Sequence, residues 1–294
     1  MTFEALTWNP PTPPPKPEDA PLALCLHGYP DTAWTWRHLG PHLAERGWRV
    51  VAPYMRGYAP TELAPDRCYQ VGALAHDAIG AHAALGGDRR AVLIGHDWGA
   101  VATYAVAAHA PELFARVVAL AIPPAGPVLG RLLAPANLPA NLPLIARQLR
   151  CSWYMLFQQL PGISERSLDR LIPWLWSAWS PGYDGAEDVA RALEALDTPA
   201  RRSAAMRYYR ALFQPWYRSW RYAAEQRAMV GTPRVPTLYM HGAEDRCMRP
   251  ELLRFAEHAL PSGSETVLVE SSGHFLQLER PEFVNERVAA FISQ

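Results

Sequence analysis

The sequence predicts an α/β fold, with a mostly parallel, doubly wound sheet that is interrupted by an all-helical insertion. Short continuous apolar runs alternate with helical stretches, which is typical of parallel strands covered on both faces. This alternation stops from about residue 123 to residue 231 and then resumes. The 294 residues are 49% hydrophobic and 19% charged, which is enough apolar material for one large core.

The expected elements follow one another in a regular order. Glycine or proline ends several of the helices, as at Gly47 and Pro111. Strands are expected at residues 3–8, 22–26, 49–53, 91–94, 117–122, 235–240 and 266–269. Helices are expected at residues 36–46, 72–85, 98–110, 250–259 and 281–292. The core therefore comprises residues 1–122 and 232–294, and a helical cap comprises residues 123–231.

A Pro-rich lead-in forms part of residues 1–21. Its prolines, between residues 10 and 21, favour extended and unpaired backbone. A linker-like segment is the simpler interpretation, and a PxxP ligand is the alternative.

Charge and composition exclude several classes of protein. The 28 basic and 28 acidic side chains balance, which argues against a general binder of nucleic acid or of anionic membranes. No apolar run approaches the roughly 18 residues of a spanning helix. The four cysteines are widely scattered and predict neither a zinc site nor a disulfide scaffold. We expect a cytoplasmic protein, without a signal peptide, that is a monomer or a homodimer.

The candidate nucleophile is Asp97. It stands at the centre of GHDWG, residues 95–99, between an expected strand and an expected helix. A tight strand-to-helix turn with glycine on both sides presents its central side chain at the carboxyl edge of the sheet, and that residue is usually serine. A carboxylate in its place can displace a leaving group from a saturated carbon and form an alkyl ester of the enzyme. The alternative is that Asp97 only caps the following helix.

Two backbone N–H groups are expected beside this nucleophile. The segment HGYP, residues 27–30, follows the first core strand, so the amides of Tyr29 and Trp98 can bind the oxyanion formed when water attacks the ester. His27 is expected to brace the turn rather than to transfer protons.

The base and its orienting acid are expected from the last two strand ends. His274 lies in the loop after the final strand and is the candidate base. Asp245, in the loop after strand 235–240, is preferred to its neighbour Glu244 as the acid that fixes the histidine tautomer. His96 and His241 also lie at strand ends, but structural roles suit them better. The order nucleophile, acid, base is that of α/β-hydrolases.

Together these motifs resemble the epoxide-hydrolase branch of the α/β-hydrolase superfamily. The similarity extends from residue 21 to the C-terminus and includes HGYP at 27–30, RGY at 56–58, GHDWG at 95–99, Asp245 and GHF at 273–275. Met55 and residues 59–61 depart from the family pattern, but these positions carry no chemistry. The resemblance implies an α/β-hydrolase fold with a cap, and hydrolysis of an epoxide to a vicinal diol without a metal or organic cofactor.

The same resemblance implies two cap tyrosines that bind the epoxide oxygen and help to protonate it. Tyr154 matches the first position. Tyr209 is favoured for the second, with Tyr208 and Tyr217 as rivals.

Two other functions stay open. Haloalkane dehalogenases resemble the chain at the nucleophile turn, but they typically hold the halide with an Asn where Tyr29 stands. Fluoroacetate dehalogenases carry an Arg where Trp98 stands, and a serine esterase would need Ser at position 97. A non-catalytic ligand-binding protein of the same fold is the remaining alternative.

The substrate is expected to be a small apolar epoxide. The cap is rich in tryptophan, which indicates either an apolar pocket or ordinary packing between cap helices. The tryptophans concerned are Trp153, Trp174, Trp176, Trp179, Trp216 and Trp220.

Overall fold

The computed structural model describes residues 1–12 and 19–294. Within these residues, seven strands form one sheet in the order β1-β3-β2-β4-β5-β6-β7. The edge strand β1 is antiparallel to β3, and every other pair is parallel. The strands are β1 (Ala5–Trp8), β2 (Leu22–Leu26), β3 (Arg49–Pro53), β4 (Val92–His96), β5 (Arg116–Leu120), β6 (Thr237–Gly242) and β7 (Glu265–Val269). The predicted α/β fold with a mostly parallel sheet is confirmed.

Both faces of the sheet are buried. Along β2, Leu24 contributes to one hydrophobic cluster, and its neighbours Ala23 and Cys25 contribute to another. This alternation is the period of two expected of a strand, and it explains why the central strands are apolar throughout. The helices around the sheet are α1 (Leu39–Ala44), α2 (Val71–Ala84), α3 (Trp98–His109), α10 (Ala223–Ala228), α11 (Leu253–Ala256), α12 (Leu276–Glu279) and α13 (Pro281–Ile292).

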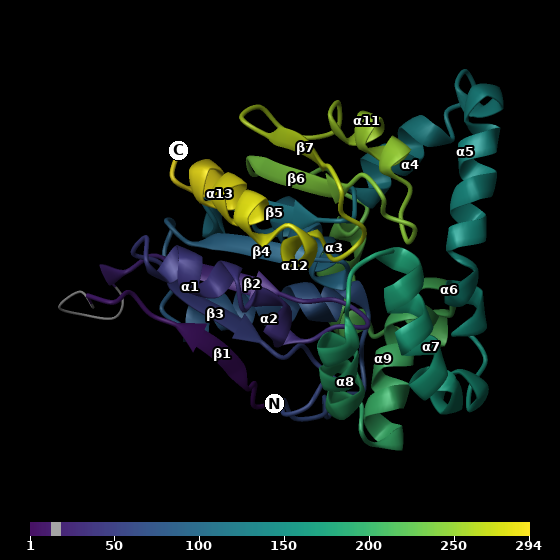
Figure 1. Cartoon of the computed structure of the whole chain (residues 1–294), viewed down its shortest axis with the longest axis horizontal. Helices are drawn as coiled ribbons and strands as arrows, with labels where there is room; N and C mark the ends of the chain where they lie inside the picture. The colour runs from purple at the N-terminus through teal and green to yellow at the C-terminus, as the bar shows by residue number, and fades with distance from the viewer. Residues whose placement is uncertain (13–18) are drawn as a thin grey trace.

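The helical insertion gathers at one end of the molecule, beside the sheet (Figure 1). No strand occurs between residues 123 and 231, a stretch that the structure describes in full. Its α-helices are α4 (Ala125–Leu132), α5 (Leu138–Cys151), α6 (Trp153–Phe157), α7 (Ile163–Trp179), α8 (Ala186–Ala195), α9 (Pro199–Phe213) and, at its end, α10, which packs on the core. Both ends of the insertion rest on the core, because α4 contacts α11 and α10 contacts α2 and α3.

Two predicted helices are shorter than expected. The helix predicted at 36–46 is a 3₁₀ turn, η2 (Ala33–Trp36), followed by α1. Pro41 explains the late start of α1, since proline lacks an N–H and is tolerated only in a first turn. The helix predicted at 250–259 begins as a 3₁₀ turn, η6 (Pro250–Leu252), and α11 ends at Ala256. Most other boundaries agree within two residues, and α12 was not predicted. Residues 13–18 of the Pro-rich lead-in lie outside the described residues.

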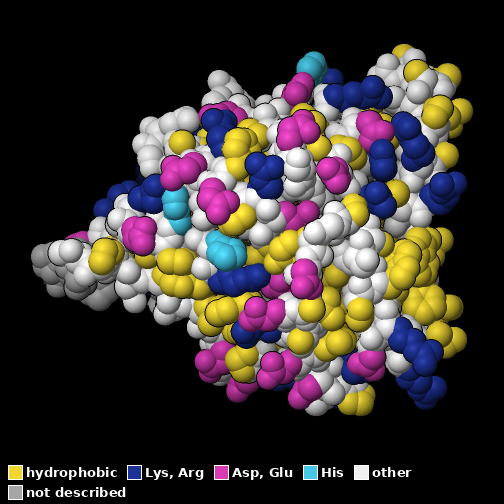
Figure 2. Space-filling view, in the orientation of Figure 1, with side chains coloured by type: hydrophobic (Ala, Val, Ile, Leu, Met, Phe, Trp, Pro, Cys, Tyr) yellow, Lys and Arg dark blue, Asp and Glu magenta, His cyan; other side chains and the backbone are white. Residues whose placement is uncertain are grey.

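Tryptophans of the cap do not share one environment. Trp176 and Trp179 are buried, but Trp153, Trp174, Trp216 and Trp220 are each at least 42% exposed. Four of the six rings therefore lie on the surface, and of the six only Trp176 and Trp179 are placed where they could line a buried pocket. Figure 2 shows hydrophobic side chains gathered on the outer side of the cap region.

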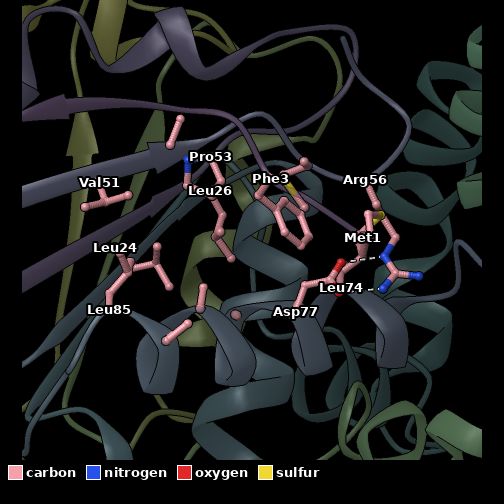
Figure 3. Close-up of a pocket in the computed structure, with 15 residues that line it drawn as sticks. Met1, Phe3, Leu24, Leu26, Val51, Pro53, Arg56, Leu74, Asp77 and Leu85 are labelled. Carbon is pink, nitrogen blue, oxygen red and sulfur yellow. Dashed lines mark hydrogen bonds and ion pairs between the residues drawn. The ribbon is translucent and has the colours of Figure 1, made fainter. Parts of the chain in front are cut away.

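A cavity of about 320 Å³ lies between the sheet and α2. Small side chains of α2, including Ala78 and Ala81, leave this space unfilled, and Met1 and Phe3 line it from the N-terminal segment (Figure 3). At one end of the cavity, Arg56 forms an ion pair with Asp77 at 2.5 Å.

Candidate active site

Asp97 occupies a strained turn between β4 and α3. Its backbone φ of 51° and ψ of −117° lie outside the regions that a residue with a side chain prefers. A Cβ at Gly99 would stand 2.1 Å from the carbonyl oxygen of Leu26, so only glycine lets α3 approach β2 this closely. The Asp97 side chain makes no capping hydrogen bond to α3, so the helix-cap alternative has no support. The shape is the strand-turn-helix expected from the glycine spacing.

The site lies where the strand order reverses. The chain runs from β2 outward to β3 and then returns to the other side of β2 as β4. The loops after β2 and β4 therefore meet at the carboxyl edge, which is where open α/β sheets bind ligands.

The loop after β2 contacts the candidate nucleophile directly. The backbone N–H of Tyr29 donates to Asp97 Oδ1 at 2.8 Å. A Cβ at Gly28 would stand 2.4 Å from the Asp97 side chain, so this loop can approach the carboxylate only with glycine at that position. The predicted amide donor Tyr29 is thus bonded to one oxygen of the Asp97 carboxylate.

His274 links the two acids that the sequence singled out. Its Nδ1 donates to Asp245 Oδ2 at 2.9 Å, and its Nε2 lies 3.7 Å from Asp97 Oδ2. All three side chains are buried. Burial opposes the imidazolium, but interactions with Cys247, Asp245 and Asp97 outweigh it and raise the pKa of His274 well above its usual value.

The acid is Asp245 and not Glu244. Glu244 is exposed, whereas Asp245 is buried beside His274. The second oxygen of Asp245 accepts the backbone N–H groups of Cys247 at 2.7 Å and Met248 at 3.0 Å. These bonds fix the carboxylate and leave its other oxygen for the imidazole.

Three other histidines brace loops. Met55 N–H donates to His27 Nε2 at 2.9 Å, so His27 carries its proton on Nδ1 and donates to the Gly28 carbonyl. His96 Nε2 donates to the His274 carbonyl at 2.9 Å, and His241 Nε2 donates to the Met248 carbonyl at 3.1 Å. Burial lowers the pKa of His27 to about 4 and that of His96 to about 3, so both stay neutral near pH 7.

The structure separates the three rival tyrosines. Tyr208 donates its hydroxyl to the Arg56 carbonyl at 2.7 Å, and Tyr217 is only half-buried, under Arg207. Tyr209 packs against the ring of Trp98 at 5.0 Å and the ring of Tyr154 at 5.7 Å. The Tyr208 ring also packs against Trp98, at 5.6 Å, but its hydroxyl is already bonded, whereas Tyr209 contacts Trp98 and Tyr154 together.

Both cap tyrosines of the site are held protonated. Burial raises the pKa of Tyr154 and of Tyr209 well above the usual value, and Asp97 adds to the rise at both. The Tyr209 hydroxyl is buried and has no hydrogen-bond partner among the described residues. Each phenol can therefore donate to an oxygen that gains negative charge.

Cys247 is a neighbour that the sequence analysis missed. Its Sγ lies 3.4 Å from the Tyr154 hydroxyl, within hydrogen-bonding distance. Gln148 of α5 donates to the Cys247 carbonyl at 3.1 Å and accepts from Arg249 N–H at 2.9 Å, which fastens the cap to the loop after β6. The only sequence signal was its place two residues after Asp245.

Comparisons with known proteins agree with this geometry. A family described as having the alpha/beta hydrolase fold matches residues 21–281. The chain belongs to the alpha/beta hydrolase fold family. It is 30% identical over 282 residues to the AB hydrolase superfamily protein YfhM of Bacillus subtilis, covering 94% of this chain and 91% of that protein.

Two further members of the family are named epoxide hydrolases. The chain is 30% identical over 304 residues to epoxide hydrolase A of Mycobacterium tuberculosis, covering 93% of this chain and 91% of the relative. The crystal structure of epoxide hydrolase A from Mycobacterium thermoresistibile superposes with a TM-score of 0.71 at 26% identity, over 92% of this chain and 90% of that one. The resemblance to the epoxide-hydrolase branch is confirmed.

Two features are absent from the described ranges, 1–12 and 19–294. No group of three or more His, Cys, Asp or Glu side chains there is arranged to hold a metal ion. No helix in the same ranges combines the length and apolar character of a membrane span.

Proposed function

We propose that this protein hydrolyses an epoxide to a vicinal diol through a covalent ester on Asp97. The observation that carries the proposal is the convergence of a buried carboxylate, a histidine–aspartate pair and two protonated tyrosines at one sheet edge. The named epoxide hydrolases that are similar over most of the chain support the same activity.

Ring opening is the first step. Asp97 attacks a ring carbon, the carbon–oxygen bond breaks, and the electron pair stays on the epoxide oxygen. Tyr154 or Tyr209 gives its phenolic proton to that oxygen. The raised pKa of both phenols suits this role, because each keeps its proton until a strong base appears beside it.

Ester hydrolysis is the second step. His274 takes a proton from water, the water oxygen attacks the ester carbonyl, and the N–H groups of Tyr29 and Trp98 stabilise the oxyanion. When the ester bond breaks, Asp97 is restored and the diol leaves. The two protons of the water end on the second hydroxyl of the diol and on His274, which by then has given its own proton to the tyrosine, so the site returns to its starting state.

The charge of Asp97 couples the two steps. While Asp97 is ionised, it helps to keep the pKa of His274 high, and an imidazolium cannot act as a base. Esterification turns this carboxylate into a neutral group. The pKa of His274 then falls, so the imidazolium can pass its proton to the tyrosinate left by ring opening and then accept a proton from water as a neutral imidazole.

Intact-protein mass of the His274→Ala variant tests the proposal. After exposure to styrene oxide, the ester should accumulate as a mass gain equal to the whole epoxide, and Asp97→Ala should show no gain. An alkyl adduct that forms only from a chloroalkane would replace the proposal with a dehalogenase. The absence of any adduct, together with no diol from the wild type across a panel of epoxides, would leave a ligand-binding protein.

A further inference from the structure

Gln158 is a buried amide that no step of the proposed mechanism uses. It follows α6 one helical turn after Tyr154, and its backbone N–H donates to the Tyr154 carbonyl at 2.9 Å. Its side chain is fully buried, yet its amide oxygen and nitrogen form no hydrogen bond of good geometry with any described residue. Buried polar atoms nearly always have a hydrogen-bond partner, so two buried amide atoms without a good one need an explanation.

The adjacent glutamine shows what a structural amide looks like in this cap. Gln159 donates to the carbonyls of Met155 at 2.9 Å and Tyr209 at 3.2 Å, and it accepts from Gln214 at 2.8 Å. Its hydrogen bonds tie α6 to α9. The side chain of Gln158 has no such task, and its backbone carbonyl accepts from Arg210 at 3.0 Å.

The Gln158 amide lies on the substrate side of the cap. It interacts with the Tyr29 hydroxyl, which is buried too and has no other polar partner in the described part of the chain. The Tyr29 ring packs against the ring of Tyr209 at 5.3 Å, and the backbone N–H of Tyr29 donates to Asp97. Gln158 therefore faces the same small region as the candidate nucleophile and the second cap tyrosine.

We propose that Gln158 and the Tyr29 hydroxyl form a hydrogen-bonding subsite for a hydroxyl group carried by an otherwise apolar epoxide. This inference rests on the proposed function and names the substrate class of that site. A carboxamide offers both a donor and an acceptor, and a phenol does the same, so a substrate hydroxyl can pair with both at once. An apolar epoxide would leave most donors and acceptors of these buried groups unpaired, which is how a site discriminates against an analogue that lacks the group.

Comparison of kcat/KM for epoxides with and without a hydroxyl group tests the subsite. The probes are 1,2-epoxyhexane and a series of epoxyhexanols. Each epoxyhexanol carries a single hydroxyl, at a different one of the carbons outside the epoxide ring. Wild type should show a kcat/KM for at least one epoxyhexanol that is roughly tenfold or more above that for epoxyhexane. Gln158→Met keeps an unbranched side chain of similar length but removes the amide, and it should abolish this ratio while epoxyhexane is still turned over.

Gln159→Met is the matched control. It breaks the link between α6 and α9, so it should lower the melting temperature and reduce turnover of all the probes together, with their ratio unchanged. An unchanged ratio in Gln158→Met, or equal kcat/KM for all probes in wild type, would overturn the subsite and leave the epoxide-hydrolase proposal intact. A wild type that converts none of the probes, or any epoxide of a wider panel, would defeat the proposed function itself.

Discussion

Glu279 accepts backbone hydrogen bonds from the residues on both sides of His274. Gly273 N–H donates to one carboxylate oxygen at 2.8 Å, and Phe275 N–H donates to the other at 3.1 Å. Ser180, at the end of α7, adds a third bond to this carboxylate at 2.6 Å. The loop that carries the candidate base is thus clamped from α12, and the clamp extends to the cap.

Loss of this clamp should slow the reaction without weakening substrate binding. Glu279→Ala leaves the Gly273 N–H unpaired and the Phe275 N–H with only Ser180 Oγ as acceptor, so His274 can shift. We therefore expect kcat to fall about 10- to 100-fold with KM little changed. Glu279→Gln retains one acceptor oxygen, so its kcat should lie between those of wild type and Glu279→Ala. Steady-state kinetics on an epoxide would measure this, and equal kcat values in all three proteins would contradict a positioning role.

The adjacent residues Tyr208 and Tyr209 should respond in opposite ways to the same substitution. Tyr209→Phe removes an unpaired hydroxyl from the site, so we expect turnover to fall at least about 10²-fold with no loss of stability. Tyr208→Phe removes the bond to the Arg56 carbonyl, so it should cost about 1 kcal/mol of stability and leave kcat nearly unchanged. Parallel kinetics and urea unfolding separate the two, and a loss of turnover confined to Tyr208→Phe would reverse the assignment.

The pKa of His274 should depend on the charge of Asp97. Asp97 and Asp245 both raise this pKa, so Asp97→Ala should lower it and leave Asp245 as the remaining carboxylate partner. Titration of the imidazole by NMR in wild type and variant would measure the shift. The coupling proposed for ester hydrolysis would be wrong if the two titration curves coincided.

Ionisation of Asp31 should lower the free energy of unfolding as the pH rises. Burial raises the pKa of Asp31 to about 7 in the folded protein, whereas an aspartate in an unfolded chain titrates near about 4. The folded state therefore holds this proton to higher pH, and the resulting stabilisation is complete below about pH 4 and is lost as the pH rises through about 7.

Asp31→Asn should remove this dependence. Urea unfolding between pH 5 and pH 8 should give curves for wild type and variant that diverge by at most about 1.4 kcal/mol per pH unit. Parallel curves would show that the pKa of Asp31 in the folded protein lies outside this pH range.

Filling the cavity beside α2 should stabilise the fold. Ala81 lines the 320 Å³ space, so Ala81→Leu adds apolar atoms where few neighbours are displaced, and we expect a gain of about 1 kcal/mol. Ala83→Leu, on the exposed side of the same helix, is the control and should change the free energy of unfolding little. Equal values from urea unfolding for both variants would show that the cavity does not relax around a larger side chain.

The sequence by itself determined the order of elements and the residues of the nucleophile turn. Continuous apolar runs mark buried parallel strands, and Gly95 and Gly99 mark a turn whose backbone cannot carry larger side chains. Asp245 and His274 followed from strand order, because the carboxyl ends of parallel strands meet at one edge. These signals are local in the sequence or follow from the order of the strands, so the sequence alone contains them.

Only the tertiary structure decided which side chains of the cap face the site. Tyr208 and Tyr209 are neighbours on α9, and helix periodicity points them about 100° apart without fixing which one turns inward. The same holds for Gln158 and Gln159, and for the cap tryptophans, of which most lie outside. The direction of each depends on how the helix is rotated against its neighbours. That rotation is set by packing across residues distant in the chain, such as Tyr208 on Arg56 and Gln148 on Cys247.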